Sequence, residues 1–194
     1  MFLVSTGLIV GLVIVALVII LIIACISTYN KLVQLRNKVK NQLSQVDVQL
    51  KKRFDLIPNL VETCKGYAAH EESIYGEFAK ARGLYAQASQ QGDVNKMAEA
   101  DKGLSGAISR LLMVQERYPE LKADKHFTEI MQQLKDCEKT IATARQFYND
   151  IVQKYNDKVE MFPSSIIAKM FKFKLAEFYT ITNEAEREAP KVTF

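Results

Sequence analysis

Residues 8–26 read LIVGLVIVALVIILIIACI, an apolar stretch that decides how the rest of the chain is arranged. In a helix that rises about 1.5 Å per residue, a stretch of this length spans about 28 Å, close to the roughly 30 Å hydrocarbon core of a bilayer. A cleaved signal peptide typically has a basic start and a shorter apolar region, whereas the first charged side chain here is Lys31. The sequence therefore predicts a retained transmembrane helix in an anchor over residues 1–28.

The end of this stretch leaves one alternative open, because Ile22-Ile23-Ala24-Cys25 is similar to a bacterial lipobox. In that case Cys25 would become the lipidated first residue of an exported protein. The absence of a basic start disfavours this interpretation. In the transmembrane interpretation Cys25 is one more small apolar residue of the helix.

Charge beside the anchor predicts its orientation. Between residues 31 and 53, seven Lys and Arg side chains accompany a single acidic residue, Asp47, and the formal net charge of the whole chain is only +4. Basic residues next to a membrane span stay on the cytoplasmic side. We therefore expect a single-pass protein of the bacterial inner membrane, with the N-terminus outside and the C-terminal part in the cytoplasm. Nucleic-acid binding is disfavoured, since the basic excess lies against the lipid bilayer.

Beyond the anchor, apolar residues recur at steps of three and four, which is typical of packed helices. The first stripe runs from Leu32 to Ala68 and passes through Pro58, which lacks an N–H and predicts a kink. We expect one long helix over about residues 29–89, bent near Pro58, with a break into two helices there as the alternative. Gly92 suits a helix end and Asp93 a helix start, so a second helix is expected over residues 93–118.

The third predicted helix, over residues 121–162, has the most regular pattern, a 3-4 repeat from Phe127 to Phe162. A final helix over residues 164–186 is expected to bury its large apolar side chains, and residues 187–194 to form a tail. Those apolar side chains are Ile167, Met170, Phe171, Phe178 and Ile181. The predicted fold class is all-α: a transmembrane helix followed by an antiparallel, four-helix type bundle over residues 29–186.

Residues 169–174, KMFKFK, alternate basic and apolar side chains. This pattern suits a membrane surface. It also suits a core helix whose lysines reach out to water, and we favour this second interpretation.

The sequence offers little chemistry. His70 and His126 are its two histidines, and Ile74 occupies the position where a zincin helix needs its second histidine. A metal-binding bundle using Asp55, Glu62, His70 and Glu71 stays as an unfavoured alternative, because these residues do not share one helix face and need ligands from a second helix. We therefore expect no catalytic residue, cofactor, metal or small-molecule substrate.

Two groups of polar residues are candidates for an interaction surface. Around the predicted kink these are Asp47, Arg53, Asp55, Asn59 and Glu62. On the third helix Tyr148-Asn149 recurs seven residues later as Tyr155-Asn156, which places Asn149 and Asn156 on one helix face. Such residues either line a peptide groove or ligand site, or form a hydrogen-bonded polar layer that fixes helix register, or plain solvated surface. We favour the polar layer or solvated surface over the binding site.

The stretch DVQLKKRFDLIPNLVE at residues 47–62, together with KGYAAHE at 65–71, YPELK at 118–122 and the ending EREAPKV at 186–192, closely resembles the bacterial LemA family. The resemblance covers almost the whole chain. It implies a single-pass membrane protein with a cytoplasmic antiparallel helical bundle, and it associates the chain with membrane organisation, including magnetosome biogenesis. It implies no reaction, cofactor or catalytic residue.

These observations favour a non-enzymatic membrane scaffold that recruits or organises other membrane proteins by protein–protein interaction. A self-assembling membrane organiser, a homo-oligomer, is the alternative. The sequence does not distinguish packing within one chain from packing between chains, because the same apolar helix face can pack in either way.

Overall fold

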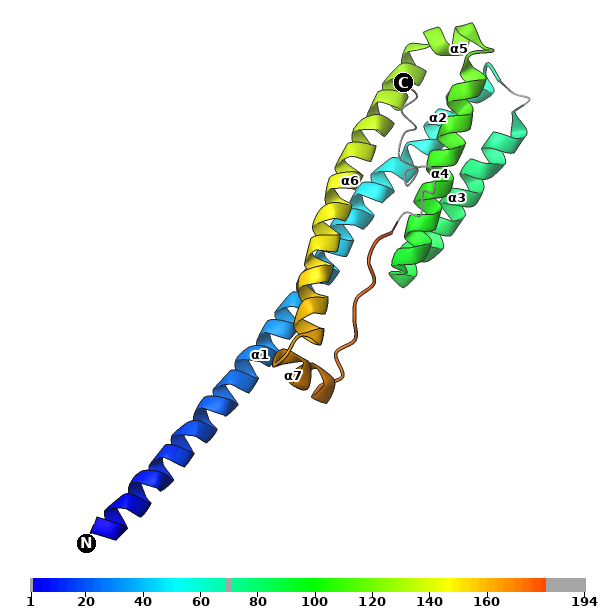
Figure 1. Cartoon of the computed structure of the whole chain (residues 1–194). Helices are drawn as coiled ribbons and strands as arrows, with labels where there is room; N and C mark the ends of the chain where they lie inside the picture. The colour runs from blue at the N-terminus through cyan, green and yellow to red at the C-terminus, as the bar shows by residue number, and fades with distance from the viewer. Residues whose placement is uncertain (1, 69–70, 181–194) are drawn as a thin grey trace, which may run out of the picture. The chain divides into compact units, whose positions relative to one another are not determined.

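The computed structural model describes residues 2–68 and 71–180, with side chains from Gly7 onward. Within these ranges every regular element is a helix, which confirms the predicted all-α fold. The chain forms two compact units, the first from residues 1–41 and 150–176 and the second from residues 42–149 and 177–194. Helices α1 (Phe2–Asp55) and α6 (Lys125–Glu160) each contribute residues to both units (Figure 1).

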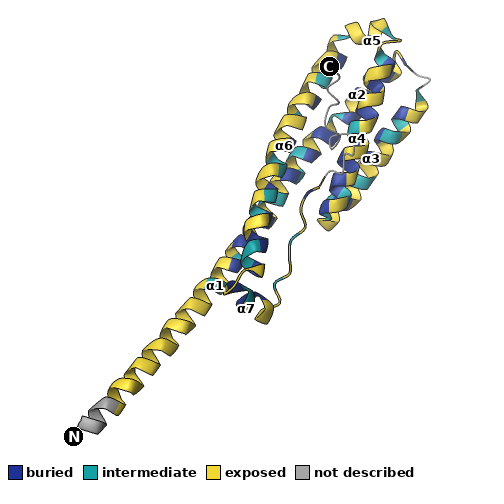
Figure 2. Cartoon of the chain, in the orientation of Figure 1, coloured by how far each residue is buried: buried dark blue, intermediate teal, exposed yellow. Residues whose placement is uncertain are grey.

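In the first unit, α1 supplies the predicted anchor. All large apolar side chains from Leu8 to Ile26 are about half exposed or more, and the helix is coloured as exposed along this whole stretch (Figure 2). The helix is long and apolar enough to cross a membrane. A solvent-facing helix of this composition would be unfavourable in water, so a bilayer is the environment that the stretch fits.

The rest of the first unit packs on the part of α1 that follows the anchor. Its interior is formed by apolar side chains of α1, α6 and α7 (Ser164–Met170). These are Leu32, Leu35, Val39, Val152, Tyr155, Val159, Ile167 and Ala168. After α7 the chain runs without regular structure from Phe173 to Thr180, the end of the described residues.

The second unit is a bundle of the end of α1 with α2 (Ile57–Lys65), α3 (Glu72–Gln91), α4 (Val94–Gln115), α5 (Pro119–Ala123) and α6. Helices α3 and α4 lie side by side and antiparallel (Figure 1). They are joined as the sequence predicts: Gly92 adopts a left-handed conformation with φ of 64°, and the Asp93 carboxylate accepts the N–H of Lys96 at 3.0 Å. This N-cap satisfies one of the free donors at the start of α4.

The long helix expected over residues 29–89 is interrupted twice. Leu56 separates α1 from α2, because Pro58 cannot donate a backbone hydrogen bond and lies in the first turn of α2. The second interruption, between Lys65 and Glu72, was not expected. Its reason is visible in the pattern: among the described residues the buried stripe that runs through α2 ends at Ala68 and that of α3 starts at Ile74, and a step of six leaves the helix face that steps of three and four maintain.

The expected helix over residues 164–186 is wrong in its length, since α7 ends at Met170. Of the side chains expected to be buried there, Ile167 is buried, whereas Met170, Phe171 and Phe178 are exposed; Ile181 lies outside the described residues, as does the expected tail. Phe162, expected at the end of the third apolar stripe, is also exposed. The physical reason is that side chains of α6 hydrogen-bond the backbone after Phe173, which removes its need to be helical.

Candidate functional site

Arg53, one of the predicted polar candidates, lies in the interior of the second unit and is 2% exposed. It is held in the last turn of α1 between the buried Leu50 and Phe54. Its guanidinium Nη1 lies 2.5 Å from Asp101 Oδ1, and Nη2 donates to Ser105 Oγ at 3.1 Å. Burial lowers the pKa of Arg53, and the nearby Glu138 carboxylate acts in the opposite direction.

Asp101 is the centre of this arrangement. It extends from α4 and is buried, and its second carboxylate oxygen pairs with Arg145 of α6. The Arg145 guanidinium also lies over the ring of Tyr179, with 5.0 Å between its Cζ and the ring centroid. One carboxylate between two guanidiniums thus ties α1, α4 and α6 together. Buried charges that pair across helices in this way hold the helices in register.

A second polar contact joins α1 to α3. The Asp47 carboxylate accepts from the Tyr85 hydroxyl at 2.9 Å and from Ser89 Oγ at 3.1 Å. The Tyr85 ring stacks on Phe54 with 4.4 Å between centroids. Burial, followed by the hydrogen bond to Asp47, raises the pKa of Tyr85. Asp47 therefore fixes a tyrosine in the core.

The remaining candidates near the kink are exposed. Asp55, Asn59 and Glu62 lie on the surface, and the last two line an open depression of about 350 Å³ with His126 and Glu129. Among residues 7–68 and 71–180, no three His, Cys, Asp or Glu side chains are grouped so that they could hold a metal ion. His70, part of the metal alternative, lies outside those ranges. The structure therefore does not bring the five kink residues together into one site.

Asn149 and Asn156 act as clamps on the main chain of the segment that follows α7. In the first unit, Asn156 Nδ2 donates to the Ala176 carbonyl at 3.0 Å and its Oδ1 accepts the Ala176 N–H at 2.9 Å. In the second unit, Asn149 contacts Tyr179 in the same two ways, at 3.1 and 2.9 Å. Each side-chain amide thus satisfies the backbone N–H and C=O of one residue of the segment, as a paired β-strand would.

The tyrosine that precedes each asparagine contacts the same segment. The Tyr155 hydroxyl donates to the Lys174 carbonyl at 2.7 Å, and the Tyr148 hydroxyl donates to the Glu177 carbonyl at 2.8 Å. All of these contacts are to the main chain of the segment.

Sequence reasoning missed Asp101, Arg145 and Tyr85. A signal for Asp101 existed, because it lies between Met97 and Leu104 at helical spacing, in the middle of an apolar stripe. Arg145 likewise lies between Ile141 and Tyr148 on the buried side of α6. A charged residue at an apolar position indicates a buried pair, although the sequence alone does not name its partner.

Comparison with known proteins gives a consistent family. The sequence profile described as the LemA family matches residues 42–194. The magnetosome protein MamQ 2 of Paramagnetospirillum magneticum is 28% identical over 78% of this chain, and the magnetosome protein MamQ of Magnetospirillum gryphiswaldense is 25% identical over the same share. The alignment spans 64% of the length of each relative.

Proposed function

The chain belongs to the LemA family, and we propose that it is a membrane-anchored, non-enzymatic helical scaffold that recruits or organises other membrane proteins. One observation carries the proposal: α1 is a single helix from Phe2 to Asp55, so the apolar anchor and the first helix of the bundle are the same element. The part of α1 that packs in the first unit, from Leu32 to Val39, follows the anchor without a linker, which suits a platform held at the membrane better than a tethered, freely moving domain.

The arrangement of polar residues supports a structural rather than a catalytic role. Arg53, Asp101 and Arg145 pair with one another, and Asn149 and Asn156 hold main-chain groups. A catalytic site uses perturbed side chains that face a cavity where a substrate fits. These five residues are instead engaged in holding the fold.

We further propose that the N-terminus lies outside the inner membrane and that the bundle is cytoplasmic. The support is the run of seven basic residues between 31 and 53. A variant with its three cysteines replaced and one cysteine introduced at the exposed Met113 tests this in cells. A membrane-impermeant maleimide should label it only after the membrane is permeabilised, and labelling of intact cells would contradict the orientation.

The relatives named for the magnetosome support a role in membrane organisation, which the family resemblance also implies. The alignment leaves out about a third of each relative, so the relatives do not indicate where partners would bind. We therefore look for a partner-binding surface on this chain itself. Phe147 of α6 is 57% exposed and borders an open hollow with Gln42, Gln45 and Gln49 in the second unit. An exposed aromatic beside side-chain amides is a reasonable contact point for a partner helix.

The test is photocrosslinking in cells, with a photoreactive phenylalanine at Phe147 of the full-length protein and the buried Tyr148 as the control position. A reproducible heterologous partner from position 147 alone would establish a recruiting scaffold. Crosslinks from position 147 only to a second copy would instead favour the self-assembling organiser. Turnover of a substrate by the purified protein, lost through one change that leaves it folded, would overturn the non-enzymatic proposal.

A further inference from the structure

The segment from Met161 to Phe171, which contains α7, turns its apolar side chains outward. Its buried residues are the small or medium-sized Ser164, Ile167 and Ala168. Its exposed residues are large and apolar, with exposed fractions from 52% for Phe171 to 80% for Phe162. They are Met161, Phe162, Ile166, Met170 and Phe171. We call these five residues the α7 apolar cluster. Grouped apolar exposure of this kind marks a surface that something other than water contacts.

The position of this segment relative to the anchor suggests what covers it. The ring of Phe171 lies 4.6 Å from the ring of Tyr29, and the ring of Phe173 lies 5.8 Å from it. Tyr29 follows Ile26, the end of the apolar stretch, by three residues, or about 4.5 Å along the helix. Figure 1 shows α7 beside α1 just after the anchor, inside the first unit. The segment therefore lies at the level of the headgroup region, where aromatic rings accumulate.

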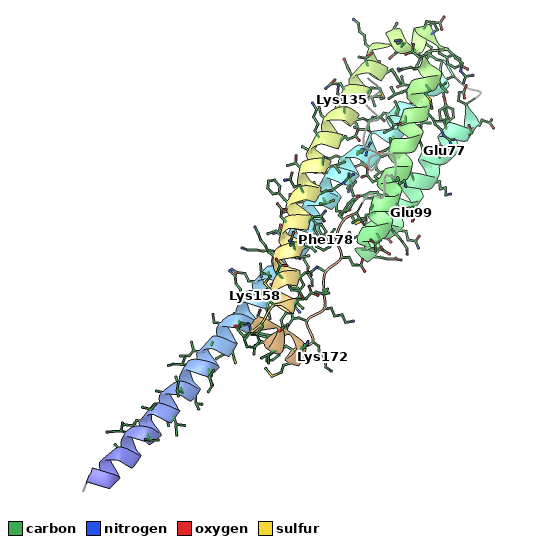
Figure 3. The ribbon with its side chains drawn as sticks, in the orientation of Figure 1. Glu77, Glu99, Lys135, Lys158, Lys172 and Phe178 are labelled. Carbon is green, nitrogen blue, oxygen red and sulfur yellow. The ribbon has the colours of Figure 1, made fainter. Side chains whose placement is uncertain are left out.

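Charge around the α7 apolar cluster fits the same environment. Residues 158–176 contain four lysines and one acidic residue, Glu160. Figure 3 shows Lys158 and Lys172 extending from the two elements that flank the cluster, α6 and the turn after α7. Each lysine close to an anionic surface strengthens binding to that surface. A helix that combines an outward apolar face with flanking lysines is typical of interfacial membrane elements.

A hollow beside the end of the anchor is lined by residues that change from apolar to polar along α1, as the environment does from the bilayer core to the headgroups. It measures about 680 Å³ and is open to solvent. Along α1 its lining passes from the apolar Ile23 and Ile26 to the polar Ser27, Thr28, Asn30, Lys31 and Gln34, and Lys158 of α6 also lines it. A phospholipid changes in the same direction, from its apolar acyl chains through the ester region to the charged phosphate. The hollow thus suits a lipid molecule whose phosphate meets the two lysines.

We propose that α7 and its two flanking turns form a second membrane-contacting element, which inserts the α7 apolar cluster into the headgroup region of an anionic bilayer. Phe162, Ile166 and Met170 enter the boundary with the acyl chains, while Lys158, Lys169 and Lys172 contact lipid phosphates. The last turns of α6 are then attached to the bilayer beside α1. Attachment at two places restricts how the first unit tilts on the membrane, which a single transmembrane helix does not.

The absence of tryptophan from the chain makes a direct test possible. The variant Phe162→Trp places one tryptophan in the α7 apolar cluster of the full-length protein, and Phe147→Trp places one at an exposed aromatic position of α6 in the second unit as the matched control. Both proteins are reconstituted into phosphatidylcholine vesicles with and without phosphatidylglycerol. Brominated acyl chains then report which tryptophan reaches the lipid. Ile166→Trp repeats the measurement if Phe162→Trp does not fold.

Brominated lipid should reduce the fluorescence of Trp at position 162 by roughly half or more and that at position 147 by about a tenth or less, with stronger quenching at 162 in anionic vesicles. Adding Lys169→Glu and Lys172→Glu should remove that anionic increment. Equal quenching at positions 162 and 147 would overturn the proposal. A blue-shifted but unquenched emission that depends on protein density would also overturn it, because a second copy would then cover the cluster.

Discussion

Arg53 Nη1 and Asp101 Oδ1 lie 2.5 Å apart in the interior of the second unit, although the two residues are 48 positions apart in the chain. Because both side chains are almost completely buried, each has lost its hydration and depends on the other for compensation. Packing of α4 against α1 therefore requires the pair. The pair also explains why a charged residue is tolerated among the buried apolar residues of each helix.

Removing Asp101 should destabilise the bundle more than removing Arg53. Asp101→Leu leaves both Arg53 and Arg145 without this carboxylate, and an uncompensated buried charge costs about 3–5 kcal/mol. Arg53→Met leaves Asp101 paired with Arg145, so its cost should be smaller. Urea unfolding of the full-length protein in detergent, followed by circular dichroism, measures both changes.

The matched control for these variants is Arg110→Ala, which removes an exposed ion pair with Glu77. An exposed pair contributes about 0.2–1 kcal/mol, so this change should barely move the unfolding midpoint. If Asp101→Leu proved no more destabilising than Arg110→Ala, the buried pair would not be what holds α4 in place.

Asn156→Ala should release the segment after α7 without unfolding the helices. The change removes two hydrogen bonds to Ala176, together about 1–2 kcal/mol, which corresponds to roughly five- to thirtyfold faster local opening. Hydrogen exchange at the Ala176 amide and tryptic cleavage after Lys174 both measure this opening. Gln153→Ala, an exposed change on the same helix, should leave both rates unchanged. Loss of the whole helical signal would show that the asparagine is needed for folding, contrary to this expectation.

The parts of the fold that depend on neighbouring residues could be predicted. The anchor follows from the apolar stretch at residues 8–26, and the joint between α3 and α4 follows from Gly92 and Asp93, because both are properties of short segments. The disturbance of the helix at Pro58 belongs to the same class, although a kink was expected there and the break between Asp55 and Ile57 was only the alternative. Each of these features has its cause within a few residues.

The segment after α7 could not be predicted in this way. The apolar residues Met170, at the end of α7, and Phe171 and Phe178 after it are spaced as in a helix, but the backbone of the segment is hydrogen-bonded by side chains of α6. The repeated Tyr-Asn pair identified the residues that clamp, and the sequence contained no information on what they hold. The pairing of Arg53 with Asp101 could not be predicted for the same reason, because the two residues are far apart in the sequence.

Two buried tyrosines, Tyr148 and Tyr179, should make the folded protein less stable at alkaline pH. Burial raises the pKa of Tyr148 and of Tyr179 to about 12, against about 10 in an unfolded chain. Between these values the unfolded state loses the proton first, so the stability that depends on the neutral hydroxyls is complete below about pH 10 and is lost as the pH rises towards 12. Tyrosinate absorbance, unobscured because tryptophan is absent, should rise later in the folded protein than in denaturant.

Tyr148→Phe provides the control for this titration. It should remove one late-titrating group and the hydrogen bond to the Glu177 carbonyl. If the folded wild-type protein instead titrated as a single group of tyrosines near pH 10, these hydroxyls would not be buried as the structure shows.

Cys64 should be protected from alkylation by two effects that act together. It is fully buried in α2, and burial raises the pKa of its thiol to about 12, so almost no reactive thiolate exists near neutral pH. Cys137 on α6 is only partly buried, although burial also raises its pKa. A water-soluble maleimide should therefore label Cys137 in the folded protein and Cys64 only when denaturant is added, as peptide mass spectrometry can resolve. Cys137→Ser should abolish the labelling of the folded bundle; equal labelling of Cys64 and Cys137 without denaturant would mean that α2 opens far more often than a packed helix does.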